Sequence, residues 1–271
     1  MKHVDKVVVV DDGSTDDTAS IAEHLGAHLV RHEGNMGYGA AIQSCFSFAR
    51  DLNSDALVIL DADGQHDADD IPKILAPIEA GEADIVVGSR FAGAGASEVP
   101  SYRRAGLRLV NEATNRIAKQ KISDTQSGFR AYSRKAIQQI KIYEQGMGVT
   151  SEIQIRGGDA GLTVTEVPVD MAYEGLKTSS QNPFSHGLEV LSAVLRIAGE
   201  KHPVALFGVP GFLAIVVGIG GWLWVANRFA EVQQLPLGMA LVSTILLLGG
   251  IVSLLTGLIL YAIANVSRRL R

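Results

Sequence analysis

Short apolar segments alternate with longer segments of helical periodicity through the first ninety residues, and a polar turn follows each apolar segment. Strands are predicted at Lys6–Val10, Ala27–Arg31, Ala56–Leu60 and Ala83–Gly88, and helices at Thr15–Leu25, Gly39–Asp51 and Asp69–Ala80. Apolar strands that alternate with helices are typical of a mostly parallel sheet covered on both faces. In such sheets ligands bind beyond the carboxyl ends of the strands. The predicted fold class is therefore α/β.

The pattern changes after residue 200, where two long segments carry no charged residue. Val204–Ala226 has 23 residues and Leu237–Val266 has 30. About 20 residues of helix cross the roughly 30 Å hydrocarbon layer of a membrane. Trp222 and Trp224 lie near the end of the first segment, where interfacial aromatic residues are common. A pair of buried helices in a soluble core is the alternative, but such helices rarely remain uncharged for so long. We therefore predict a transmembrane hairpin.

The charges divide the chain at the same point. The whole chain has 24 Lys and Arg against 29 Asp and Glu, a net charge of −5. Residues 201–271 carry +4, so residues 1–200 carry −9. Basic residues flank the outer ends of the hairpin, and the positive-inside rule then places residues 1–200 and the C-terminus in the cytoplasm. The acidic front part argues against nucleic acid as a partner, and the single Cys45 excludes a disulfide framework.

These patterns predict a multi-pass protein of the cell membrane whose α/β domain occupies residues 1–175. Residues 176–203 are expected to form an amphipathic juxtamembrane region on the lipid surface. The two spans, the extracytoplasmic loop between them and a basic cytoplasmic tail are expected at 204–226, 237–266, 227–236 and 267–271.

The strongest chemical signal is Asp61-Ala62-Asp63, which directly follows a predicted strand. Two carboxylates one residue apart can point the same way from a turn and hold a hard divalent cation, and Gln65 can add a carbonyl oxygen. Mg²⁺ or Mn²⁺ prefers such ligands and shares its other positions with phosphate and water. An acidic surface turn is the alternative, and a second acidic strand end makes it less probable.

That second strand end is Asp11-Asp12-Gly13-Ser14-Thr15-Asp16. Its carboxylates can hydrogen-bond the base or ribose of a nucleotide, while Ser14 or Thr15 can cap the next helix. The glycine-rich turn Gly34–Gly39 can bring backbone amides close to a ligand before a helix begins. It lacks the spacing of the dinucleotide fingerprint, which argues against a nicotinamide enzyme.

Cationic residues mark a further region of the acidic domain. Arginine binds phosphate oxygens in a bidentate manner, so these side chains are candidates to cradle an anionic substrate, with solvated surface arginines as the alternative. The set consists of Arg90, Arg103, Arg104 and Arg108, and Arg130 is a separate candidate phosphate partner. Nearby Asp124 could act as a base or as an orienting carboxylate.

Taken together and in order, the motifs resemble the family 2 glycosyltransferases, which have the GT-A fold. The nearest resemblance is to the dolichyl- or polyprenyl-phosphate sugar synthases, in the archaeal form with two C-terminal membrane helices, and it covers nearly all of the chain. The motifs that carry it are Val7–Thr18, Gly34–Ile42, Leu60–His66, Val86–Phe91, Ser123–Tyr132 and Asn182–Gly187. The Gln-x-x-Arg-Trp motif of processive members is missing, which favours a single transfer over polymer synthesis.

The resemblance implies an inverting hexosyltransferase that moves one sugar from a nucleotide-sugar donor to dolichyl or polyprenyl phosphate for glycosylation. It implies donor contacts from Asp11, Asp12, Ser14, Asp16, Asn35 and Asp61. It implies a Mg²⁺ or Mn²⁺ site at Asp61, Asp63 and Gln65, and acceptor-phosphate contacts from Arg90, Arg104 and Arg130. Asp124 would be catalytic or would orient the acceptor. The sugar is open among UDP-glucose, UDP-N-acetylglucosamine and GDP-mannose, and a homo-oligomer is compatible with the family.

One departure from the family shapes these expectations. Relatives have an additional strand, turn and helix before the strand at Lys6–Val10, and we hypothesise that the printed sequence is shortened relative to the working protein. Three rival functions stay open at this point. They are a glycosyltransferase with another lipid acceptor, a nucleotidyltransferase, and an inactive membrane scaffold.

Overall fold

The computed structural model describes residues 2–92, 101–169, 190, 192–194, 196–199 and 203–269, with the backbone alone at 101–109 and 266–269. The chain divides into two compact units, Met1–Val194 and Leu195–Arg271. Most of the predicted juxtamembrane region 176–203, including the Asn182–Gly187 motif, lies outside the described residues.

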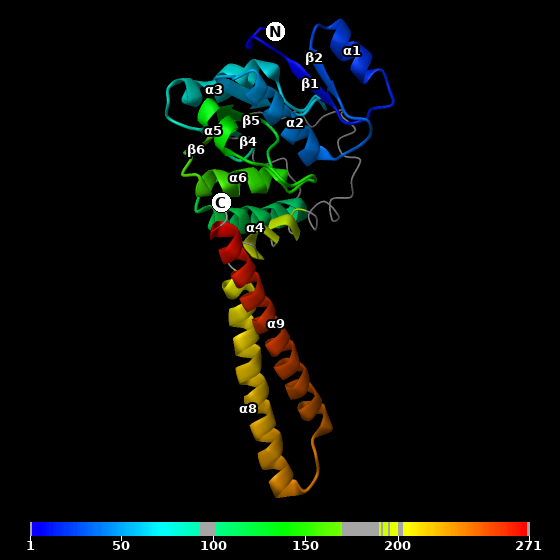
Figure 1. Cartoon of the computed structure of the whole chain (residues 1–271), viewed down its shortest axis with the longest axis vertical. Helices are drawn as coiled ribbons and strands as arrows, with labels where there is room; N and C mark the ends of the chain where they lie inside the picture. The colour runs from blue at the N-terminus through cyan, green and yellow to red at the C-terminus, as the bar shows by residue number, and fades with distance from the viewer. Residues whose placement is uncertain are drawn as a thin grey trace. The chain divides into compact units, whose positions relative to one another are not determined.

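Up to β4 the first unit alternates strands and helices as its hydrophobic pattern predicts, and the elements that follow were not predicted (Figure 1). Its strands are β1 (Val8–Asp11), β2 (His28–Arg31), β3 (Ala56–Ile59), β4 (Ile85–Ser89), β5 (Arg130–Ser133) and β6 (Val164–Pro168). Its helices are α1 (Thr18–His24), α2 (Tyr38–Asp51), α3 (Ile71–Glu79), α4 (Ser101–Ala118), α5 (Arg134–Gln139) and α6 (Val149–Asp159), with a 3₁₀ turn, η1, at Ala68–Asp70.

Among the described residues, the strands form two sheets. β1 pairs in parallel with β2, and the other four strands are ordered β3-β5-β4-β6. β6 runs parallel to β4, but β5 runs antiparallel to both of its neighbours, so the larger sheet is mixed. β5 begins with Arg130 opposite Ile59 of β3 and Val87 of β4, near the carboxyl ends of those strands. The turn before β5 therefore lies at the edge where the acidic turn after β3 lies.

Alternation along the strands explains how helices cover both faces of the larger sheet. One face packs against residues of α2, α5 and α6, and the strands contribute Ile59, Ile85 and Tyr132. The opposite face packs against α3, and the strands contribute Val86 and Ala131, the immediate neighbours of Ile85 and Tyr132. Successive strand residues point to opposite faces, so each strand supplies both cores.

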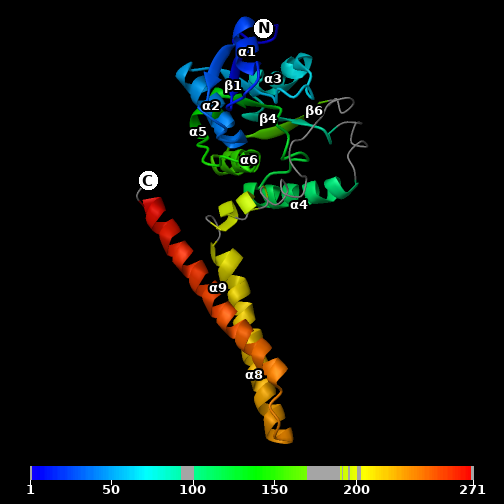
Figure 2. The same cartoon turned by 90° about the vertical axis from the view of Figure 1, so that its right-hand side faces the viewer.

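The second unit is a helical hairpin. A π-helical turn, η2 (Val204–Gly208), leads into α8 (Val209–Val232), and α9 (Leu237–Arg269) runs beside α8 (Figure 2). Gly211 and Gly250 let the two backbones approach, because a Cβ at Gly211 would lie 2.7 Å from the carbonyl oxygen of Gly250. Val204–Val232 and Leu237–Asn265 are both long and apolar enough to cross a membrane. The first helix continues six residues past the predicted end of its span.

Candidate functional site

The acidic turn after β3 offers oxygen ligands at the edge of the larger sheet. Asp61 is partly buried and Asp63 is exposed, and Asp63 Oδ1 accepts a hydrogen bond of 3.0 Å from the backbone N–H of Gln65. Burial raises the pKa of Asp61, and a hydrogen bond from Tyr38 opposes part of that rise. A cation or a donor hydroxyl next to Asp61 would favour its charged form.

The residues of this turn fit a cation that is shared with a phosphorylated ligand. Two carboxylates and the Gln65 amide are hard oxygen donors, but a divalent cation of this class takes about six ligands. No three His, Cys, Asp or Glu side chains converge as a self-sufficient metal site in the described part of the chain, at this turn or at any other place. The arrangement therefore suits Mg²⁺ or Mn²⁺ completed by diphosphate and water oxygens.

Two residues that the sequence analysis did not select fix the position of Asp61. The partly buried Tyr38, at the start of α2, makes the hydrogen bond to its carboxylate. Gly128 lies directly beneath the carboxylate, where a Cβ would overlap Asp61 Oδ2 and would lie 2.9 Å from Cγ. The Ser123–Tyr132 motif therefore contacts the Leu60–His66 motif at Gly128. The sequence shows a tyrosine in the glycine-rich turn, but it does not show that Asp61 is the hydrogen-bond partner of this tyrosine.

His66 occupies the space between the acidic turn and the turn before β5. Its ring centroid lies 5.0 Å from that of Phe129, and its Nδ1 is buried without a hydrogen-bond partner among the described residues. Burial lowers the pKa of His66, so the ring is neutral at pH 7. The charges of Asp61, Asp63, Arg90 and Asp124 all act on it. The side chains from β3, β4 and the turn before β5 are therefore gathered at one place.

Asp12 is engaged by the protein itself. Its Oδ1 accepts a hydrogen bond from the backbone N–H of Met36 (2.9 Å) and lies 2.6 Å from His32 Nδ1, while Oδ2 accepts from the N–H of Gly37 (2.8 Å). Burial would raise the pKa of Asp12, but these hydrogen bonds outweigh it and the pKa is lowered. His32 Nε2 is in turn 2.9 Å from Ser44 Oγ. Asp12 thus anchors the glycine-rich turn to the end of β1.

The other residues of the predicted donor set lie around the ends of β1 and β2. Asp11 is buried, and its Oδ1 accepts from the N–H of Ser14 at 2.8 Å. Ser14 lines a cavity of about 410 Å³ together with Arg31 and His32. Asn35 is exposed. The structure therefore places Ser14 and Asn35 where a ligand can reach them and turns Asp11 inward.

The helix after β1 starts later than the sequence indicated. α1 begins at Thr18, and its preceding residues show no side-chain cap from Ser14 or Thr15. Instead, Asp16 Oδ1 accepts hydrogen bonds from the Thr18 backbone N–H at 3.1 Å and from Thr18 Oγ1 at 2.5 Å. Because the Asp16 carboxylate accepts both hydrogen bonds at once, these bonds favour a start of α1 at Thr18.

Asp124 is fully buried and holds Arg90 through both carboxylate oxygens. Arg90 Nε donates to Asp124 Oδ2 at 2.6 Å, and Nη2 donates to Oδ1 at 2.7 Å. The backbone N–H of Arg90 also donates to Oδ2, at 3.2 Å. The Arg90 side chain is 20% exposed, whereas that of Asp124 is 0% exposed. This bidentate geometry fixes the guanidinium plane, and it favours the orienting role of Asp124 over that of a base.

Arg130 is 1% exposed, and its position does not fit the phosphate-binding role that the sequence suggested. Its guanidinium donates to the backbone carbonyls of Ser127 at 2.8 Å, Thr125 at 2.6 Å and Thr150 at 3.2 Å. The side chain therefore braces the turn before β5 from within. Arg104 lies in α4, where it and its neighbours Arg103 and Arg108 have side chains outside the described part.

Comparisons with known proteins identify the family of this chain. Residues 2–141 match the family described as glycosyl transferase family 2. Glycosyltransferase AglJ of Haloferax volcanii is 30% identical over 264 residues, which are 97% of this chain and 86% of that protein. The dolichyl-phosphate hexose transferase of the same organism is 29% identical over 196 residues, covering 72% of this chain and 82% of that protein. The chain belongs to the family 2 glycosyltransferases and is a transferase.

A solved structure supports the fold. Glucosyl-3-phosphoglycerate synthase from Mycobacterium tuberculosis, in complex with Mn²⁺ and UDP-glucose, matches with a TM-score of 0.56 and 23% identity. The match covers 72% of this chain and 69% of that one. The predicted GT-A fold is confirmed, together with two long apolar C-terminal helices.

Proposed function

We propose that this glycosyltransferase moves one sugar from a nucleoside-diphosphate donor to the phosphate of a membrane polyprenol, with inversion at the anomeric carbon. The observation that carries the proposal is Arg90, which Asp124 holds at the edge where Asp61 and Asp63 follow β3. Transfer between two phosphorylated ligands needs a cationic group close to the place where the donor diphosphate binds. The dolichyl-phosphate acceptor named for the relative from Haloferax volcanii supports the acceptor class.

On the donor side, the cavity beside Ser14 takes the nucleoside. The backbone N of Asn35 lies close to Gly13, which lines this cavity. Asp61, Asp63 and Gln65 would hold Mg²⁺ or Mn²⁺, which when bound neutralises charge on the departing diphosphate. The Mn²⁺ and UDP-glucose bound by the M. tuberculosis synthase support this class of cofactor and donor. Asp12 contributes by holding the glycine-rich turn in place.

On the acceptor side, the nucleophile is already charged. A lipid phosphate is an anion at neutral pH, so the transfer needs alignment and charge stabilisation more than it needs a strong base. Arg90 binds and orients the phosphate, and Asp124 keeps the guanidinium plane fixed. Arg104, from α4, is proposed as a second phosphate contact.

The proposed setting is the cytoplasmic face of a membrane that α8 and α9 cross. The apolar length of both helices and the basic residues at the outer ends of the hairpin support this topology. The chain offers a clean test, because burial raises the pKa of its single cysteine, Cys45, to about 11 and makes that thiol slow to react. A thiol reagent that cannot cross membranes should label Leu235→Cys from the outside of intact cells. Labelling only after permeabilisation would contradict the topology.

The reaction is tested in membranes that contain the full chain. Radiolabelled UDP-glucose, UDP-N-acetylglucosamine and GDP-mannose are offered with polyprenyl phosphate, with Mg²⁺, Mn²⁺ or EDTA. We expect one donor to give a lipid-linked monosaccharide and a nucleoside diphosphate, and we expect EDTA to stop the reaction. Release of pyrophosphate would identify a nucleotidyltransferase. Transfer to diacylglycerol but not to the lipid phosphate would reject the proposed acceptor, and Arg90→Ala provides the matched inactive variant.

A further inference from the structure

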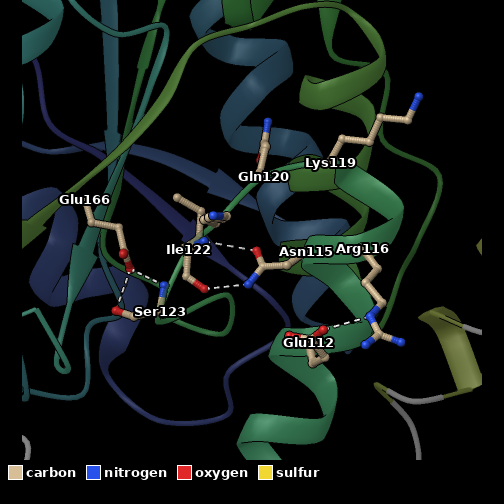
Figure 3. Close-up of a pocket in the computed structure, with 9 residues that line it drawn as sticks. Glu112, Asn115, Arg116, Lys119, Gln120, Ile122, Ser123 and Glu166 are labelled. Carbon is tan, nitrogen blue, oxygen red and sulfur yellow. Dashed lines mark hydrogen bonds and ion pairs between the residues drawn. The ribbon is translucent and has the colours of Figure 1, made fainter.

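The short turn that carries Asp124 is held by side chains from both sides. On one side stands Glu166, at the centre of β6, which is paired with Val87 of β4. Its Oε1 accepts hydrogen bonds from the backbone N–H of Ser123 at 2.8 Å, the Ser123 hydroxyl at 2.9 Å and the backbone N–H of Asp124 at 3.0 Å. One carboxylate oxygen thereby fixes two consecutive peptide groups. Figure 3 shows Glu166 reaching Ser123.

On the other side stand two asparagines one helical turn apart on α4. Asn111 Nδ2 donates to the Ser123 carbonyl at 2.6 Å, and its Oδ1 accepts from the N–H (3.2 Å) and the hydroxyl (2.6 Å) of Thr125. Asn115 makes the same kind of double contact with the N–H and carbonyl of Ile122, as Figure 3 shows. Residues four apart lie on one face of a helix, so α4 presents both amides to the turn.

These contacts leave the turn little freedom. The residues before, at and after Asp124 are each hydrogen-bonded through the backbone to a side chain from another element. Asp124 is in turn the group that fixes the guanidinium plane of Arg90. A shift of the turn would therefore be passed directly to Arg90, and displacement of about 1 Å at a reacting site can cost about a hundredfold in rate.

We propose that Glu166, Asn111 and Asn115 form a turn clamp whose role is to position the Asp124–Arg90 pair for the acceptor phosphate. The inference rests on the proposed function of Arg90 and extends it to residues that touch neither substrate. Glu166 and the asparagines are positioning residues, because each acts through the turn. β6 is held in the sheet by its backbone, so the carboxylate is not needed for strand pairing.

The test compares Glu166→Ala with Glu166→Gln in the membrane assay. Glutamine keeps the Oε1 that accepts all three hydrogen bonds, whereas alanine removes it. We expect Glu166→Ala to raise the KM for polyprenyl phosphate at least about tenfold, with little change in the KM for the nucleotide sugar. We expect Glu166→Gln to remain within about threefold of the wild type. A merely structural role would reduce the amount of active enzyme and leave both KM values unchanged.

Glu112→Ala is the matched control. Glu112 lines the same cavity as Glu166 and follows Asn111 directly, but it pairs with Arg116 at 2.7 Å and makes no described contact with the turn. It should keep both wild-type KM values. Asn111→Asp is the second clamp variant. It retains the acceptor for Thr125 but places a carboxylate against the Ser123 carbonyl, so it should raise the KM for the lipid phosphate as Glu166→Ala does.

Asp124→Asn separates failure of the clamp from failure of the proposed function. If Asp124→Asn leaves the KM for the lipid phosphate unchanged, the proposed role of the Asp124–Arg90 pair is wrong. If Asp124→Asn raises this KM while Glu166→Ala and Asn111→Asp do not, the clamp alone is wrong. Adding Glu166→Ala to Asp124→Asn should change the KM by less than about twofold, since residues that act through one group are not additive. Failure of both clamp variants to fold would also overturn the proposal, because it would assign these residues to the fold.

Discussion

A single methyl group at Gly128 should disable the acidic turn without unfolding the protein. A Cβ on this residue would overlap Asp61 Oδ2 and would lie 2.9 Å from Cγ and 3.0 Å from Oδ1. Ordinary carbon contacts are about 3.5 Å or more. The backbone at Gly128 needs no left-handed conformation, so alanine introduces no backbone strain, and the side chain of Asp61 is the part that must move.

The size of the effect follows from the required movement. Restoring normal contact displaces the Asp61 carboxylate by about 0.5–1 Å, and a misplacement of about 1 Å can cost about a hundredfold in rate. We expect kcat/KM for the nucleotide sugar to fall between about tenfold and a hundredfold in Gly128→Ala. The concentration of Mn²⁺ that gives half-maximal activity should rise as well, because Asp61 belongs to the proposed cation site.

The assay measures initial rates across a range of donor and Mn²⁺ concentrations in the same membranes, together with thermal unfolding of the purified protein. Gly249→Ala is the control, because a Cβ at that position in α9 meets open space. If Gly128→Ala folds and keeps the wild-type kcat/KM and Mn²⁺ dependence, the Asp61 carboxylate can move without consequence. That result would refute the proposed role of Asp61.

Three further predictions concern single residues. Asp63→Ala should reduce transfer at least about a hundredfold while circular dichroism and the melting temperature stay unchanged; activity that survives would remove Asp63 from the cation site. Arg130→Lys should lower the free energy of unfolding by about 3 kcal/mol, because a single ammonium nitrogen cannot reach three carbonyls that the guanidinium reaches from three separate nitrogens, yet the KM for the lipid phosphate should not change; a selective rise in that KM would restore the phosphate-binding role. Burial would raise the pKa of Asp84, but hydrogen bonds from the Thr163 backbone and Lys135 outweigh it, and the pKa is lowered. Its contribution to stability is therefore complete above about pH 5 and is lost as the pH falls below the ordinary value near 3.8. Asp84→Asn should flatten this acid-induced loss of stability in pH-dependent unfolding curves, and identical curves would contradict the assignment.

The sequence predicted the elements of the fold well where the pattern is local. The strand starting at Ala56 and the helix ending at Asp51 are found where the apolar periodicity placed them. The direction of β5 was not predictable in this way, because a run of four residues such as Arg130–Ser133 looks the same in a parallel and an antiparallel pair. Direction depends on where the chain enters the sheet, which is a property of the whole fold.

The site was predictable to the extent that its residues occur in motifs. Asp61 and Asp124 were identified from their turns, but the sequence does not state whether a side chain faces solvent. Arg130 is the clearest case, since it has the residue type of a phosphate ligand and the surroundings of a core residue. The roles of Tyr38 and Glu166 cannot be read from the sequence, because each acts on a partner far away along the chain.

The antiparallel course of β5 has a consequence for how such an enzyme can diversify. The chain leaves the sheet at the carboxyl end of β4 and returns at the same edge where β5 begins. Residues 90–129 are thus an excursion whose two ends are neighbours, and they contain Arg90, Asp124 and α4. The residues proposed for the donor, around β1 and in the turn after β3, lie outside it. On the proposed function, exchange of residues 90–129 alone would change the acceptor and leave the proposed donor residues intact.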